Sequence, residues 1–191
     1  MLRISRATAA ARAVSIVLHP FVVFSALALI AAWRLEPASL ARTLVGLGTA
    51  IAIVWLFIWQ RRRGGHWQTV DASRPQERPL LYGLVLFLAG GYWLWMGGPG
   101  SAMSAGVLAA VAMLCVAGLA NRWIKLSLHM ASLAFAGVSL LQLAPAVAAV
   151  GLMCAPLLGW SRLRLERHSY SEVLGGAALG AASALLPYLI D

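Results

Sequence analysis

The amino-acid sequence predicts an all-α fold, a polytopic bundle of about six to seven transmembrane helices that forms one domain over residues 1–191. The composition is the first reason: 61% of the residues are hydrophobic and only 11% are charged, whereas a soluble domain is about half apolar. The second reason is the presence of several apolar runs close to the roughly 20 residues that a helix needs to cross a bilayer.

Seven apolar runs define the expected spans. They cover residues 13–33, 40–60, 80–97, 101–120, 126–142, 144–160 and 171–190. The first run is too long for a signal peptide, so we expect an uncleaved first span. The Gly/Pro sequence MGGPGS separates the third and fourth runs and predicts a tight helical hairpin. Pro145 separates the fifth and sixth runs, which could alternatively form one kinked passage and a short helix.

The charge distribution predicts the orientation of the bundle. The chain has 15 Lys and Arg against 6 Asp and Glu, a formal net charge of +9. With seven crossings, every basic residue except Arg34 and Arg42 lies on one face, which the positive-inside rule places in the cytoplasm. We therefore expect an integral protein of a bacterial inner membrane. Because the basic residues lie between apolar runs, lipid headgroups and phosphate ligands explain them better than nucleic acid does.

Other residue types are expected to be structural. Cys115 and Cys154 lie inside apolar runs and form neither a disulfide framework nor a metal-type spacing, so no metal or cofactor is expected. Tryptophans near the ends of the runs are typical of an interfacial belt. The sequence GGAALG, residues 175–180, predicts close helix packing between small residues.

Three polar clusters lie at expected helix ends on the same face of the membrane. They consist of Arg74, Glu77 and Arg78, then Lys125, Ser127 and His129, and finally Ser161, Arg162, His168 and Glu172. Arg164 and Arg167 are expected to be topology residues, and His19 and His66 have no partner at an informative spacing. Ionisable groups at these positions are candidates for function.

The residue types in these clusters are those that phosphoryl transfer needs. Arginine and lysine bind a tetrahedral dianion, and arginine can contact two of its oxygens at once. One histidine can attack as a neutral imidazole while the other donates a proton to the leaving oxygen. A carboxylate can fix the tautomer of a histidine. His168 and Glu172 are four residues apart, so a helix there would place them on one face.

The spacing of the third cluster, Ser161-Arg162-x5-His168-x3-Glu172, resembles the signature S-R-x5-H-x3-D of the type 2 phosphatidic acid phosphatase / vanadium haloperoxidase superfamily, with Glu for Asp. The second cluster is similar to the signature P-S-G-H, with leucines at positions 126 and 128. The first signature, K-x6-R-P, matches at Arg78 and the following proline, but Asp71 stands in place of its lysine.

The resemblance implies a role for each matched residue. His168 would be the nucleophile that forms a phosphohistidine, Glu172 would orient it, and His129 would protonate the leaving group. The phosphoryl oxygens would be held by Arg78 and Arg162, helped by Ser127 and Lys125, with Arg74 or Lys125 filling the position of the missing lysine. The superfamily needs no metal for this chemistry.

The sequence therefore predicts a membrane phosphatase acting on a lipid phosphate or an isoprenoid (di)phosphate at the cytoplasmic interface. Its expected partners are a phospholipid or polyprenyl phosphate substrate and membrane lipids. Two alternatives stay open: a phosphotransferase with the same site, and a non-catalytic bundle that binds lipid or protein with a decayed site. Transport is less favoured because no pair of matching broken helices indicates inverted repeats.

Overall fold

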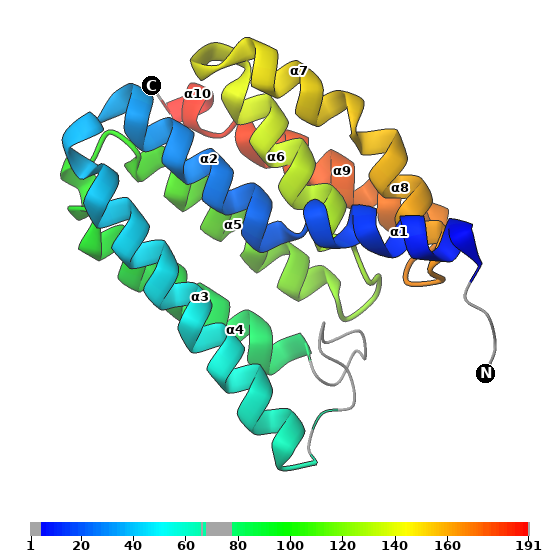
Figure 1. Cartoon of the computed structure of the whole chain (residues 1–191). Coiled ribbons are helices and arrows are strands. Elements are labelled where there is room, and N and C mark those ends of the chain that lie inside the picture. Colours follow the sequence, from blue (N-terminus) through cyan, green and yellow to red (C-terminus); the bar gives the residue numbers. More distant parts are fainter. Residues whose placement is uncertain (1–4, 66, 68–77, 191) are drawn as a thin grey trace.

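The computed structural model describes residues 5–65, 67 and 78–190. In this part of the chain the predicted all-α fold is confirmed, and no strand occurs (Figure 1). Short 3-10 turns cover Pro37–Ser39 and Gly98–Gly100. The α-helices are α1 (Arg6–Val17), α2 (Pro20–Leu35), α3 (Leu40–Arg63), α4 (Arg78–Trp95), α5 (Ser104–Ala120), α6 (Leu128–Leu143), α7 (Pro145–Met153), α8 (Ala155–Arg164), α9 (Tyr170–Ala184) and α10 (Pro187–Ile190).

The first expected span is broken in two. α1 ends at Val17 and α2 begins at Pro20, whose ring lacks an N–H and is favoured in the first turn of a helix. The Nδ1 atom of His19 caps α2 by accepting a hydrogen bond of 3.3 Å from the Phe21 N–H. α1 then packs against α8 instead of continuing the line of α2 (Figure 1). The apolar run over residues 13–33 therefore lies on two helices, and the whole stretch Arg6–Leu35 is long and apolar enough to be a membrane span.

Three helical stretches of the described chain are long and apolar enough to cross a membrane. They are Arg6–Leu35, which includes the break, Pro37–Arg63, and Pro145–Arg164, which contains α7 and α8. Pro79–Trp95, Ser104–Ala120 and Leu128–Leu143 are apolar but shorter. By length and composition alone, the structure therefore has three candidate spans.

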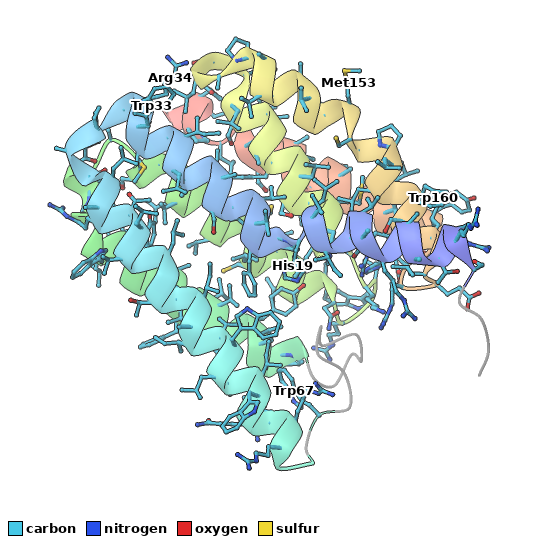
Figure 2. The ribbon with its side chains drawn as sticks, in the orientation of Figure 1. His19, Trp33, Arg34, Trp67, Met153 and Trp160 are labelled. Carbon is cyan, nitrogen blue, oxygen red and sulfur yellow. The ribbon has the colours of Figure 1, made fainter. Side chains whose placement is uncertain are left out.

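Large apolar side chains cover the outside of the bundle. Figure 2 shows Trp33, Met153 and Trp160 on the periphery, and these side chains are exposed. Met153, on the α7–α8 stretch, exposes 80% of its surface. Extensive apolar exposure of this kind marks an interaction with a membrane or a partner. The protein surface is thus compatible with burial in lipid.

Helix α6 is the centre of the fold. Every residue from His129 to Gly137 is buried, and α6 contacts α2, α5, α7, α8 and α9. Its closest neighbour is α9, where a Cβ atom on Gly176 would lie 2.5 Å from the carbonyl oxygen of Ser127. A Cβ on Gly180 would collide with the carbonyl oxygen of Ala131. The predicted close packing at residues 175–180 is confirmed, and it brings the start of α9 beside the start of α6.

Gly180→Ala should therefore destabilise the protein by about 1–3 kcal/mol, because the backbones of α6 and α9 would have to separate. The measurement is unfolding of the purified protein in detergent. Gly90→Ala on α4 is the matched control, since a Cβ there has no neighbour within 4 Å. This control should be neutral or stabilising by about 0.5–1 kcal/mol. Equal stability of the two variants would contradict the close contact.

Five helices form a ring of contacts that leaves a hollow inside the bundle. α2 contacts α3, α3 contacts α4, α4 contacts α5, α5 contacts α6, and α6 contacts α2. Figure 1 shows that α2 and α3 diverge from their shared turn, so that the space between them widens toward the end where α2 begins. A cavity of about 590 Å³ lies within this ring.

Candidate functional site

One end of the cavity collects polar side chains from segments that are distant in the sequence. The described residues that line this end are His19, Lys125, His129, Arg162, Arg167 and His168. Four of them, Lys125, His129, Arg162 and His168, belong to the set of site residues predicted from the sequence. The fold thus brings the second and third polar clusters to one cavity.

His168 is held by two acceptors on the same ring nitrogen. Its Nδ1 atom lies 3.0 Å from Oε2 of Glu172 and 3.1 Å from the carbonyl oxygen of Lys125. Both partners accept hydrogen bonds, so they favour the tautomer with the proton on Nδ1. That tautomer leaves the lone pair on Nε2, the atom that a nucleophilic imidazole uses.

Glu172 has a second task, which is to cap α9. Its Oε2 also accepts a hydrogen bond of 3.0 Å from the Ser169 N–H, while the Ser169 hydroxyl accepts from the Glu172 N–H at 3.4 Å. This is a capping box. Since the helix begins only at Tyr170, His168 lies before it, and the expectation that both residues lie on a helix is wrong. The pair forms because the capping box turns Glu172 back toward His168.

Lys125 and Ser127 precede α6 and have different surroundings. Lys125 lines the cavity, and its Nζ donates a hydrogen bond of 3.0 Å to the carbonyl oxygen of Arg167. Ser127 is fully buried, caps α6 through its hydroxyl, and donates its backbone N–H to the Glu172 carbonyl at 3.0 Å. It is not among the residues that line the cavity. Ser127 therefore joins α6 to α9, whereas Lys125 faces the site.

Ser15 on α1 lies between two of the predicted site residues. Its hydroxyl accepts a hydrogen bond of 2.7 Å from Nη1 of Arg162 and lies 3.4 Å from Nε2 of His129. Because the hydroxyl accepts from Arg162, it can direct its own hydrogen toward His129. One turn earlier on α1, the carbonyl oxygen of Ala11 accepts a hydrogen bond of 2.6 Å from the Ser161 hydroxyl. Both residues of the Ser-Arg pair are thus bonded to α1.

Sequence reasoning missed three residues of this region. His19 lines the cavity, and its ring lies 5.1 Å from that of His129 in an edge-on arrangement. Arg167 was expected to be only a topology residue, yet it also lines the cavity. Ser15 had no signal in the sequence. The His19-Pro20 pair at the start of α2 is the signal that could have indicated a helix break, and with it a histidine turned toward the bundle.

Two predicted residues have no described side-chain position. Arg74 lies outside the described residues, as does Asp71, the residue in place of the motif lysine. Arg78 begins α4, but its side chain is not described. Among the described residues, no group of three His, Cys, Asp or Glu side chains could hold a metal ion. The described part of the site therefore consists of residues on or beside the ends of α1, α2, α6, α8 and α9.

The charges at this end of the cavity favour an anion. Lys125, Arg162 and Arg167 supply three cationic groups, while Glu172 is engaged by His168 and the helix cap. Cations that converge on a partly apolar cavity attract and retain anionic ligands. Comparisons with known proteins find no match among family models, curated proteins or solved structures. Any function must therefore be argued from the site.

Proposed function

We propose that this chain is an integral membrane phosphatase that hydrolyses a lipid phosphate or an isoprenoid (di)phosphate, without a metal, through a phosphohistidine intermediate. One observation carries the proposal: a single cavity has histidines and cations at one end and apolar walls along the rest. The first part suits a phosphate headgroup, and the second suits a hydrocarbon tail. The spacing of Ser161, Arg162, His168 and Glu172, which resembles the third signature of the phosphatase superfamily, supports it further.

The proposed reaction has two steps. Nε2 of His168 attacks phosphorus, and the bond from phosphorus to the lipid oxygen breaks. His129 enters this step as the imidazolium and gives one proton to the leaving oxygen. Water then attacks the phosphohistidine, gives a proton back to His129, and releases inorganic phosphate. Glu172 holds Nδ1–H of His168 and stabilises the positive charge that develops on its ring.

The cations hold the phosphoryl oxygens in this proposal. Arg162, Lys125 and Arg167 are the candidates among the residues that line the cavity. Arg78 and Arg74 keep the roles that the superfamily resemblance implies. Ser127 is fully buried and outside the cavity lining, so it acts by joining α6 to α9 and not by holding a phosphoryl oxygen. A phosphate that binds Nη1 of Arg162 must compete with the Ser15 hydroxyl for the hydrogen bond that this atom donates.

The proposal includes six to seven membrane spans with the site on the cytoplasmic face of a bacterial inner membrane. α4, α5 and α6 have 18, 17 and 16 residues, close to the lower limit of about 17 for a transmembrane helix. Together with α2, α3 and the α7–α8 stretch they make six spans, and α9 is the seventh. This order places His19, Lys125, His129 and His168 at one membrane face, with most basic residues.

One observation favours a second candidate, a non-catalytic bundle that binds an anionic lipid. Ser161 and Arg162 both donate hydrogen bonds to α1, and in a phosphatase these donors would instead bind the phosphate. A phosphotransferase is the third candidate, in which an alcohol replaces water in the second step. Release of inorganic phosphate distinguishes the hydrolase from both.

The test is phosphate release by purified protein with chelator present, over a panel of phosphatidate, phosphatidylglycerol phosphate and polyprenyl phosphates and diphosphates. Arg162→Ala should lower kcat/KM on the best substrate by about 100-fold, the usual effect of removing one donor to transition-state charge. Arg162→Lys should recover part of this loss, because it keeps the charge but not the paired donors.

Arg164→Ala is the matched control, because Arg164 is on the same helix but exposed and outside the cavity lining. It should release phosphate at the wild-type rate. Phosphate release that requires a metal, or equal losses in Arg162→Ala and Arg164→Ala, would contradict the proposed site. No release from any substrate by folded protein would favour the lipid-binding candidate.

A further inference from the structure

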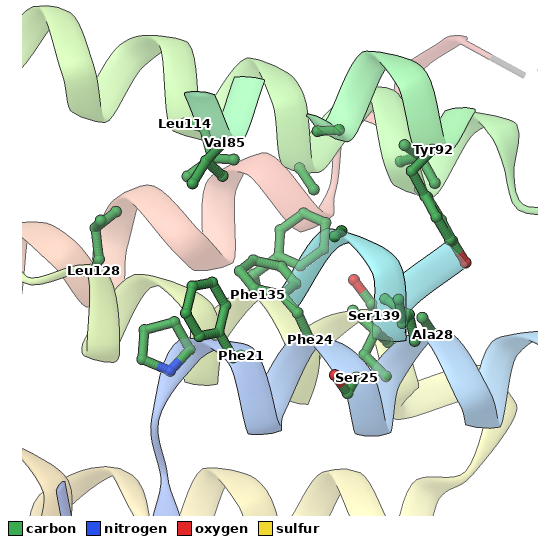
Figure 3. Close-up of a pocket in the computed structure, with 18 of the residues that line it drawn as sticks. Phe21, Phe24, Ser25, Ala28, Val85, Tyr92, Leu114, Leu128, Phe135 and Ser139 are labelled. Atoms are coloured by element: carbon green, nitrogen blue, oxygen red, sulfur yellow. The ribbon is translucent and has the colours of Figure 1, made fainter. Parts of the chain in front are cut away.

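The cavity continues far beyond the polar end. Its walls come from all five helices of the ring, α2 to α6, and they are mostly apolar. Figure 3 shows Phe21, Phe24 and Phe135 grouped in this space, with Val85 and Leu114 beside them. Walls of this kind exclude charged groups and accept hydrocarbon.

The cavity is also long. Both His129, in the first turn of α6, and Gln142, in the last turn, line it. These residues are 13 positions apart, which corresponds to about 20 Å along a helix that rises 1.5 Å per residue. The cavity thus extends from the histidines through most of the thickness of a hydrocarbon core of about 30 Å.

Small side chains keep this space open. Ala28 on α2, and Gly106 and Ala110 on α5, are part of the lining. A Cβ atom built on Gly106 would meet no other atom within 4 Å. A larger residue at position 106 would therefore have open space beside it at the cavity wall.

We propose that the cavity holds the hydrocarbon chain of the substrate inside the helix bundle, and that the substrate is a single-chain phosphate and not a diacyl lipid. The proposal rests on the proposed function for the position of the phosphate. The anionic head lies against Lys125, Arg162 and Arg167, where its charge is matched, and one chain extends from there along α6. A diacyl lipid would bring a second chain of equal length into the same space between the five helices.

The experiment uses the full chain in nanodiscs of phosphatidylcholine and measures binding of radiolabelled hexadecyl phosphate. Gly106→Phe should weaken binding by about tenfold or more, the size of effect that overfilling an apolar space causes. Gly91→Phe on α4 is the matched control, because Gly91 is exposed, lies outside the cavity lining and also has no neighbour within 4 Å of an added Cβ. It should bind hexadecyl phosphate as the wild type does. Ala28→Leu provides a second, smaller obstruction from the opposite wall.

Three further readouts decide the outcome. Unlabelled dipalmitoyl phosphatidate should compete less well than unlabelled hexadecyl phosphate, and equal competition would overturn the single-chain inference. Equal binding by wild type, Gly106→Phe and Ala28→Leu would overturn the placement of the chain in the cavity. Phosphate release from hexadecyl and butyl phosphate is measured in parallel. If no protein releases phosphate while Gly106→Phe still loses binding, the proposed function fails and the chain site stands.

Discussion

Replacing His168 by alanine is expected to abolish phosphate release, with a loss in kcat of at least about 10³-fold. The imidazole is the proposed attacking group, and Glu172 lies 3.0 Å from its Nδ1 atom. The loss should be the same for every lipid phosphate, because it concerns the phosphorus atom and not the tail. The measurement is single-turnover phosphate release in the presence of chelator.

The control for this prediction is the folded state of the variant. His168 lies before the cap of α9, so its loss should leave the Ser169–Glu172 capping box in place. Elution as a single species and an unfolding transition close to that of the wild type would show this. Folded His168→Ala that retains a substantial rate would exclude this residue as the nucleophile.

Glu172→Gln is expected to lower kcat by about 10²- to 10⁴-fold, the range in which neutralising the carboxylate partner of a catalytic histidine falls. Glutamine keeps an oxygen that can accept the hydrogen bond from the Ser169 N–H, so the helix cap should survive. What the variant lacks is the negative charge that fixes the His168 tautomer and stabilises its cation. The measurement is kcat on the best substrate of the panel.

Ser169→Ala separates this role of Glu172 from its capping role. It removes the hydroxyl that accepts the Glu172 N–H and should cost about 1 kcal/mol of stability. Activity below the unfolding transition should change little, because Glu172 still reaches Nδ1 of His168. If Ser169→Ala loses as much activity as Glu172→Gln, the carboxylate acts by capping the helix and not on the histidine.

The part of the site that could be predicted from the sequence is local or depends on small-residue packing. Spacing alone indicated the pair of His168 and Glu172, which the structure places 3.0 Å apart. The glycines at positions 176 and 180 indicated the close contact of α9 with α6, and this contact brings Lys125 to His168. The first inference needed only the spacing of two residues that are close in the sequence, and the second needed only the small residues that let two helices approach.

The rest could not be predicted because it depends on the path of α1. Ser15 meets Arg162 and His129 from more than 100 positions away in the chain, and no spacing rule reports such a contact. The run of apolar residues from 13 to 33 indicated a span, but it did not indicate the break before Pro20 or the packing of α1 across α8. Hydropathy reports which residues avoid water, but it does not report where a helix bends.

The number of spans shows the same limit. Apolar runs give the count of segments that prefer lipid, and the chain has seven. Helix length decides whether a segment can cross alone, and three stretches of the described chain satisfy that requirement. The shorter helices α4, α5 and α6 surround the cavity, where neighbouring helices and not lipid provide much of their environment.

The most direct test of the central claim is to trap the phosphoenzyme. Wild-type protein is mixed with substrate labelled in its phosphate, denatured within one turnover and mapped by mass spectrometry. We expect a phosphoryl group on His168 that is labile in acid and stable in base, present in Glu172→Gln at a lower level and absent from His168→Ala. Phosphate release from wild-type protein with no phosphoenzyme, or with the label on another residue, would contradict the mechanism.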